Sequence, residues 1–151
     1  MAEDPRHRTL EYYNTYLTAA NILKPDGVTP LSFHVQFSTP NYPLKWLFYG
    51  KAFDAVFIVE TAETTPVVDW EGSVIGYQEK VPTTIYVKSG ATVDGVKARW
   101  QCEKELRRIV ETYPISSTYR SLQRMSDNET DMGGWRLYSV NYVLTYQRDT
   151  A

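Results

Sequence analysis

The fold is decided by the stretch from Gly95 to Gln147, GVKARWQCEKELRRIVETYPISSTYRSLQRMSDNETDMGGWRLYSVNYVLTYQ. Its first part repeats apolar residues at spacings of three and four, the period of one buried helical face: Ala98, Cys102, Leu106, Ile109, Val110 and Tyr113. The opposite face is polar and is predicted to meet solvent or a partner: Lys97, Arg99, Gln101, Glu103, Lys104, Glu105, Arg107, Arg108 and Glu111. The last part alternates apolar with polar residues, which predicts a strand with one buried face: Tyr138, Val140, Tyr142, Leu144 and Tyr146.

A polar segment, residues 114–134, separates this helix from this strand and has no sustained apolar periodicity. Structureless loops longer than about 12–15 residues are uncommon in compact domains and are usually functional or disordered. The sequence therefore predicts a long loop here, either a contact loop or a disordered surface connection. A short helix over Tyr119, Leu122 and Met125 is an alternative.

The N-terminal half supplies a further helix and two strands. Asp4-Pro5 has the pattern of a helix N-cap followed by proline, and the predicted helix ends near Leu23. Residues 31–38 alternate apolar with polar residues, which predicts a strand with one face in the core. The nearly continuous apolar run from Phe53 to Glu60 predicts a central strand covered on both faces.

Two apolar runs flank Glu71-Gly72, a pair typical of a hairpin turn, and together they predict a projecting β-arm. Pro82 is expected to separate this arm from a further strand, residues 83–88. The predicted order is helix, strand, strand, hairpin, strand, helix, loop, strand. We expect one α+β domain over residues 1–151, with flexible N-terminal residues. Its mostly antiparallel or mixed sheet carries two helices on one face, and the last strand inserts between earlier ones.

Composition and charge exclude several classes of protein. A net charge of −2 argues against a dedicated nucleic-acid binder, whose affinity rests on Lys and Arg. The single cysteine, Cys102, allows no internal disulfide and no cysteine-based zinc site. The polar N-terminus lacks a signal-peptide pattern, and no apolar run approaches the roughly 20 residues that span a bilayer. We expect a soluble protein of a reducing compartment.

No strong catalytic motif is present: the sequence lacks a phosphate-binding loop, a dinucleotide fingerprint and a nucleophile elbow. His34 lies on the polar side of its predicted strand without a partner motif. Cys102 lies on the apolar helix face, where a thiol is normally inert. Asp54 and Glu60 have the even spacing of one strand face, but strand ends often carry such charges. The chain is therefore not predicted to be an enzyme, and no cofactor or metal is expected; an enzyme centred on His34 remains an alternative.

The second helix, from Trp100 to Val110, and the closing segment from Gly134 to Arg148 resemble the tail-terminator (tail-completion) proteins of tailed bacteriophages and related viruses. Together with the N-terminal helix and the intervening strands, the similarity covers most of the chain in outline. It implies a subunit of a closed, typically hexameric ring at the head-proximal end of the tail tube. The implied partners are copies of itself, the tail-tube protein and the head-connector or head-closure protein.

The resemblance further implies a virion protein made in the host cytoplasm, with the genome passing through the ring. Ring contacts are heterologous, so one patch meets a different patch on the neighbour. The aromatic share of 14% suits such interfaces. The proline-punctuated apolar loop, residues 39–52, either folds back as a lid on the core or contacts another chain. The predicted contact residues come from this loop, the arm and the polar segment: Trp46, Leu47, Phe48, Tyr49, Trp70, Glu71, Tyr77, Tyr119, Arg120, Arg124 and Met125.

Two other functions stay open from the sequence. One is another neck or tail-tube subunit of a tailed virus. The other is a small-molecule or peptide-binding module, in which Trp46, Phe48 and sheet tyrosines would line a pocket.

Overall fold

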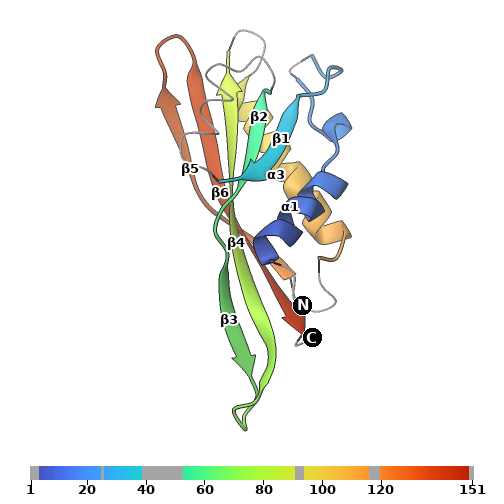
Figure 1. Cartoon of the computed structure of the whole chain (residues 1–151). Helices are drawn as coiled ribbons and strands as arrows, with labels where there is room; N and C mark the ends of the chain where they lie inside the picture. The colour runs from blue at the N-terminus through green and yellow to red at the C-terminus, as the bar shows by residue number, and fades with distance from the viewer. Residues whose placement is uncertain (1–3, 25, 39–52, 91–93, 116–119, 150–151) are drawn as a thin grey trace.

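The computed structural model describes residues 4–24, 26–38, 53–90, 94–115 and 120–149 (Figure 1). Its helical elements are α1 (Pro5–Tyr16), the 3₁₀ turn η1 (Ala19–Asn21) and α3 (Gly95–Thr112). Its strands are β1 (Phe33–Phe37), β2 (Ala55–Val59), β3 (Glu63–Val68), β4 (Val74–Ser89), β5 (Arg120–Asp131) and β6 (Arg136–Asp149).

The strands form one sheet in the order β1-β2-β4-β6-β5, with β3 paired to the first part of β4. Only β1 and β2 run parallel, and every other pair is antiparallel. The predicted α+β class is confirmed, and the sheet is mixed. The closing strand β6 lies between β4 and β5, as predicted. All five residues of β2 are buried, which confirms a central strand covered on both faces.

Both helices pack on the same face of the sheet (Figure 1). The core beneath them joins Tyr13 of α1 and Leu106 of α3 to Phe57, Ile85 and other side chains of the central strands. Tyr12 links the two helices, because its hydroxyl donates to the carbonyl oxygens of Ile109 and Tyr113, each at 2.7 Å.

The first helix is shorter than predicted, ending at Tyr16 instead of near Leu23. The reason is tertiary hydrogen bonding to Glu105 of α3. Its carboxylate accepts from the backbone N–H of Thr18 at 2.8 Å and from the side-chain amide of Asn21. These bonds hold the chain in an extended conformation at Thr18, where a helix would have continued.

The second helix has the predicted bounds and the predicted buried stripe, with Cys102 in the core. Its outer face differs from the prediction. Arg99, Glu103 and Glu105 are buried, because each meets an oppositely charged or polar partner from another part of the chain or from the same helix.

The predicted long loop over residues 114–134 is wrong for most of its length. Arg120–Asp131 forms β5, a 12-residue edge strand paired with β6, and there is no helix over Leu122 and Met125. An edge strand exposed along most of its length needs no apolar alternation, since its ladder with β6 supplies the backbone hydrogen bonds. Between β5 and β6 the chain makes a tight turn at Gly133 and Gly134, both with positive φ.

The arm is present, but Pro82 does not interrupt the chain beyond it. β4 runs as one 16-residue strand through Pro82. The Pro82 carbonyl accepts from the N–H of Glu60 at 2.9 Å, in the gap between β2 and β3. A residue in an antiparallel ladder directs its N and O to the same neighbour, so the missing N–H of Pro82 faces this gap and costs no strand pairing.

Candidate assembly surfaces

The arm, residues 63–78, lies beside β6 at its base, and its end projects beyond the rest of the sheet, since β6 pairs with β4 only as far as Gly76 (Figure 1). Its end is a tight turn built by Asp69. The Asp69 side chain accepts from the N–H groups of Glu71 and Ser73, each at 2.9 Å, and Gly72 takes a φ of 87°. This confirms the predicted hairpin turn and gives the arm a defined end.

A buried carboxylate anchors the arm at its base. Glu79 is fully buried on β4 and accepts from Nε of Arg148 on β6 at 2.6 Å and from the hydroxyl of Thr64 on β3. The Arg148 guanidinium lies over the ring of Tyr77, 4.4 Å from its centroid. Tyr77, a predicted contact residue, thus packs under an arginine of its own chain.

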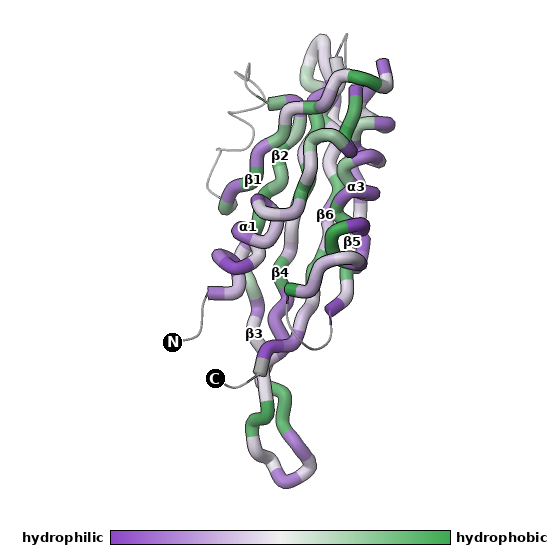
Figure 2. The backbone as a smooth tube through the Cα atoms, turned by 90° about the vertical axis from the view of Figure 1, so that its right-hand side faces the viewer, coloured by the Kyte–Doolittle hydropathy of each residue, from purple (hydrophilic) through white to green (hydrophobic). Residues whose placement is uncertain are grey.

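The arm tip, which we define as Val68, Trp70, Glu71, Val74 and Ile75, is apolar and exposed. Trp70 is 92% exposed, and the three aliphatic residues are between 43% and 55% exposed. Figure 2 shows hydrophobic positions on both strands close to the turn. The sequence from Glu60 to Glu79 contains no Lys or Arg, and its interior acidic residues are Glu63, Asp69 and Glu71. Apolar residues at an extremity, framed by acidic ones, are typical of an interaction site.

A second surface is a strip on α3, which we define as the exposed residues Val96, Lys97, Trp100 and Lys104 with the half-buried Arg107. Val96 is 50% exposed and Trp100 is 45% exposed. The Arg107 guanidinium lies 5.0 Å from the centroid of the Trp100 ring and holds the indole in place. The sequence reasoning missed Trp100 as a contact candidate. Its signal was the pair Val96 and Trp100, spaced i, i+4 outside the buried stripe.

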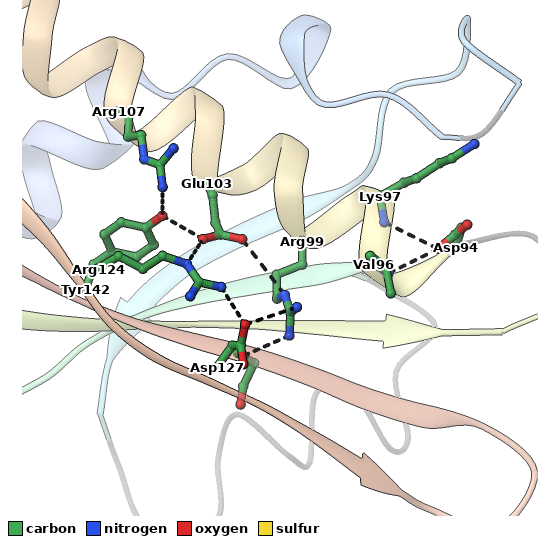
Figure 3. A network of polar contacts seen from close by, with 10 residues as sticks. Asp94, Val96, Lys97, Arg99, Glu103, Arg107, Arg124, Asp127 and Tyr142 are labelled. Carbon is green, nitrogen blue, oxygen red and sulfur yellow. Dashed lines mark hydrogen bonds and ion pairs between the residues drawn. The ribbon is translucent and has the colours of Figure 1, made fainter.

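Glu103 lies at the centre of a polar network that joins α3 to β5 and β6 (Figure 3). One of its carboxylate oxygens accepts from Nε of Arg124 and from the hydroxyl of Tyr142, each at 2.6 Å. Arg107 donates in turn to the Tyr142 oxygen at 3.1 Å. Because Glu103 is only 2% exposed, removing it would leave these partners unsatisfied in the interior.

Asp127 of β5 extends this network to the start of α3. It binds Arg124 at 2.7 Å and lies 3.5 Å from Arg99 (Figure 3). The hydrogen bond from Arg124, with the charge of Arg99, lowers the pKa of Asp127. These paired ions clamp the edge strand β5 to the helix, and the arrangement favours a structural role over proton transfer.

Two of the predicted contact residues, Arg120 and Arg124, make bonds within the chain. Arg124 belongs to the Glu103 network. Arg120 donates to the carbonyl oxygens of Val110 and Glu111 at 2.5 and 3.2 Å, so it caps the C-terminal end of α3. A hollow of about 470 Å³ adjoins it, lined by Arg107, Val110, Glu111, Arg120, Ser121 and Leu122.

The other predicted contact residues divide into exposed ones and ones that the structure does not describe. Met125 is 54% exposed at an irregularity of β5. Tyr119 and the loop residues Trp46, Leu47, Phe48 and Tyr49 lie outside the described residues. The pocket expected for a binding module needs Trp46 and Phe48, so it stays a prediction.

The residues considered for catalysis make packing contacts or hydrogen bonds within the fold. The His34 ring stacks on the Phe53 ring with 4.8 Å between their centroids, and burial lowers the pKa of His34. Burial also raises the pKa of the Cys102 thiol. Asp54 accepts from Ser32, and Glu60 from Thr84. Among the residues that the structure describes, no group of three or more His, Cys, Asp or Glu side chains is placed to hold a metal ion.

The chain matches no family model, and a search of curated proteins finds no significant relative. Within the described ranges, no helix is both long and apolar enough to cross a membrane.

Buried tyrosines predict a loss of stability at alkaline pH. Burial is the main reason why the pKa values of Tyr12, Tyr142 and Tyr146 are raised from the usual 10 to about 12. In the unfolded chain these hydroxyls ionise near pH 10, so their contribution to stability is complete below pH 10 and is lost as the pH rises to about 12. We expect the melting temperature to fall across this window, and less steeply for Tyr142→Phe.

Tyrosinate absorbance gives the direct check on this pH dependence. The buried tyrosines should ionise only as the fold is lost. The explanation fails if all 12 tyrosines ionise together near pH 10 while the circular dichroism of the native fold persists.

Proposed function

We propose that this chain is a structural virion protein, a subunit of a ring that ends the tail tube of a tailed virus and joins it to the head connector. The observation that carries the proposal is the projecting arm, which presents Trp70 at 92% exposure on a rigidly anchored hairpin. A monomeric protein gains nothing from an exposed tryptophan at such an extremity, whereas a subunit that binds a neighbour does.

Two further features support assembly. The arm tip and the helix strip are different surfaces of one chain, as a heterologous ring contact requires. The resemblance of the second helix and the closing segment to tail-terminator proteins, seen in the sequence, points to the same role. On this proposal the ring is a hexamer, its faces bind the tail-tube protein and the head-connector protein, and the genome passes through its centre. The subunit is made in the host cytoplasm, ends in the virion and performs no catalytic step.

Native mass spectrometry and negative-stain electron microscopy of the purified protein test this proposal. We expect a closed ring of fixed subunit number, whose addition to growing tail tubes stops their elongation. A protein that stays monomeric at high concentration, and is missing from the neck of assembled particles, would overturn the proposal. Unlimited polymerisation into tubes would also overturn it, and would identify a tail-tube subunit.

A further inference from the structure

We infer that the arm tip of one copy docks onto the helix strip of the next copy. The inference rests on the proposed function, because it names the contact through which the ring would close. It follows from three properties of the two surfaces: their position, their apolar content and their charge.

Position excludes a contact between these surfaces within one chain. The arm extends past the sheet at one end of the molecule, while α3 lies against β4 and β6 in the body that the helices cover (Figures 1 and 2). The N-terminal half of α3, which carries Val96 and Trp100, is the part farthest along the helix from the arm (Figure 1). A tip that meets this strip must therefore come from another copy.

Apolar content matches on the two sides. The tip offers Trp70 with three half-exposed aliphatic residues, and the strip offers Val96 and the Trp100 indole. Tryptophan is the side chain most enriched at the energetic centres of protein interfaces. The Trp100 ring is already oriented by Arg107, so little conformational entropy is lost when a partner covers it.

Charge is opposite on the two sides. The arm carries Glu63, Asp69 and Glu71 without a basic residue. On α3 the acidic residues Glu103 and Glu105 are buried and bonded within the chain, and the exposed Glu111 lies in the last turn, beyond the strip. The strip itself contains no acidic residue and is basic through Lys97, Lys104 and Arg107. An acidic, apolar tip and a basic, apolar strip attract one another, whereas two tips, or two strips, repel because their charges are alike. This favours tip-to-strip contacts over tip-to-tip contacts.

Such a contact is heterologous, because each copy uses its tip on one neighbour and its strip on the other. Repetition of one heterologous contact gives either a closed ring or an open helix. The same contact therefore explains how a single chain type could form the proposed ring.

Mixing two variants tests the inference. The arm variant Trp70→Ala/Glu71→Lys loses the tip and keeps the strip; Asp69 is left unchanged because it builds the turn. The helix variant Trp100→Ala/Lys104→Glu loses the strip and keeps the tip. We expect each variant alone to be monomeric by native mass spectrometry. An equimolar mixture retains one working contact per pair, so it should stop at the heterodimer.

Three controls make the outcomes distinct. As monomers, the two variants should share one melting temperature, whereas the wild-type ring is further stabilised by association. If removal of Trp100 lowers the melting temperature of the helix variant below that of the arm variant, Lys97→Glu/Lys104→Glu replaces it. Val28 is an apolar side chain that is 78% exposed and belongs to neither surface, so Val28→Ala should leave assembly unchanged. Rings formed by either variant alone, or a mixture that stays monomeric, would overturn the tip-to-strip contact while the proposed function stands. A monomeric wild-type protein would instead remove the proposed function itself.

Discussion

Replacing Glu103 with alanine is expected to lower the melting temperature more than any exposed substitution on the same helix. Its carboxylate binds Arg124 and Tyr142 at 2.6 Å each and is 2% exposed. Removing one partner of a fully buried ion pair costs about 3–5 kcal/mol. Here Arg124 is 36% exposed and keeps Asp127 as a partner, so the cost should lie at the lower end, about 3 kcal/mol, and come mainly from Tyr142 and Arg99. At about 2–4 °C per kcal/mol for a chain of this size, the melting temperature should fall by about 6–12 °C.

Differential scanning calorimetry of Glu103→Ala beside Glu111→Ala measures this effect. Glu111 lies on the same helix but is exposed, so its replacement should change the melting temperature little. Glu103→Gln keeps an acceptor for Tyr142 and should fall between the two. Equal melting temperatures for Glu103→Ala and Glu111→Ala would show that the network contributes nothing to stability.

The same network explains why sequence reasoning failed in two places at once. The sequence predicts that Glu103 and Arg99 lie on a face that meets solvent or a partner, because they are charged. It predicts that Arg124 and Asp127 lie in a loop, because their segment is polar. In the structure these four residues satisfy one another. The burial of a charged residue can be predicted only when its partner is known. The partner of Glu103, Arg124, lies 21 positions away in the sequence. Local periodicity contains no information about such a pairing.

Apolar periodicity, in contrast, was a reliable guide. The alternation from Tyr138 to Tyr146 placed β6 correctly, since every second side chain faces the helices. The stripe through Cys102 and Leu106 placed α3, and Glu71-Gly72 placed the arm. Of the predicted contact residues, Trp70 is exposed on a defined element, while Arg120 and Arg124 serve the fold. An aromatic residue in a hairpin turn can be predicted to be exposed from local sequence alone. The long side chain of an arginine often bonds within the chain to a partner that local sequence does not reveal.

Replacing Glu79 with alanine is expected to loosen the arm and to abolish assembly together. Glu79 sits between β3 and β6 and holds Thr64 of one strand and Arg148 of the other. Without the carboxylate, the Arg148 guanidinium loses its ion pair, a change that costs about 3–5 kcal/mol when the pair is buried. The cost should fall mainly on the arm, because beyond Gly76 the arm has no contact with β6 to compensate.

Hydrogen exchange separates this local effect from a general loss of stability. Amides of residues 63–78 should exchange faster in Glu79→Ala than in the wild type, while those of α3 change less, since local opening depends on the contacts of each region. Glu63→Ala is the matched control, because Glu63 is an exposed acidic residue on the same arm. If the arm must be rigid to bind a neighbour, Glu79→Ala should lose the ring even though Trp70 is intact. A ring that persists while the arm exchanges freely would mean that assembly does not use the arm. The single variant Glu79→Ala therefore tests two claims: that Glu79 holds the arm rigid, and that a rigid arm is needed for assembly.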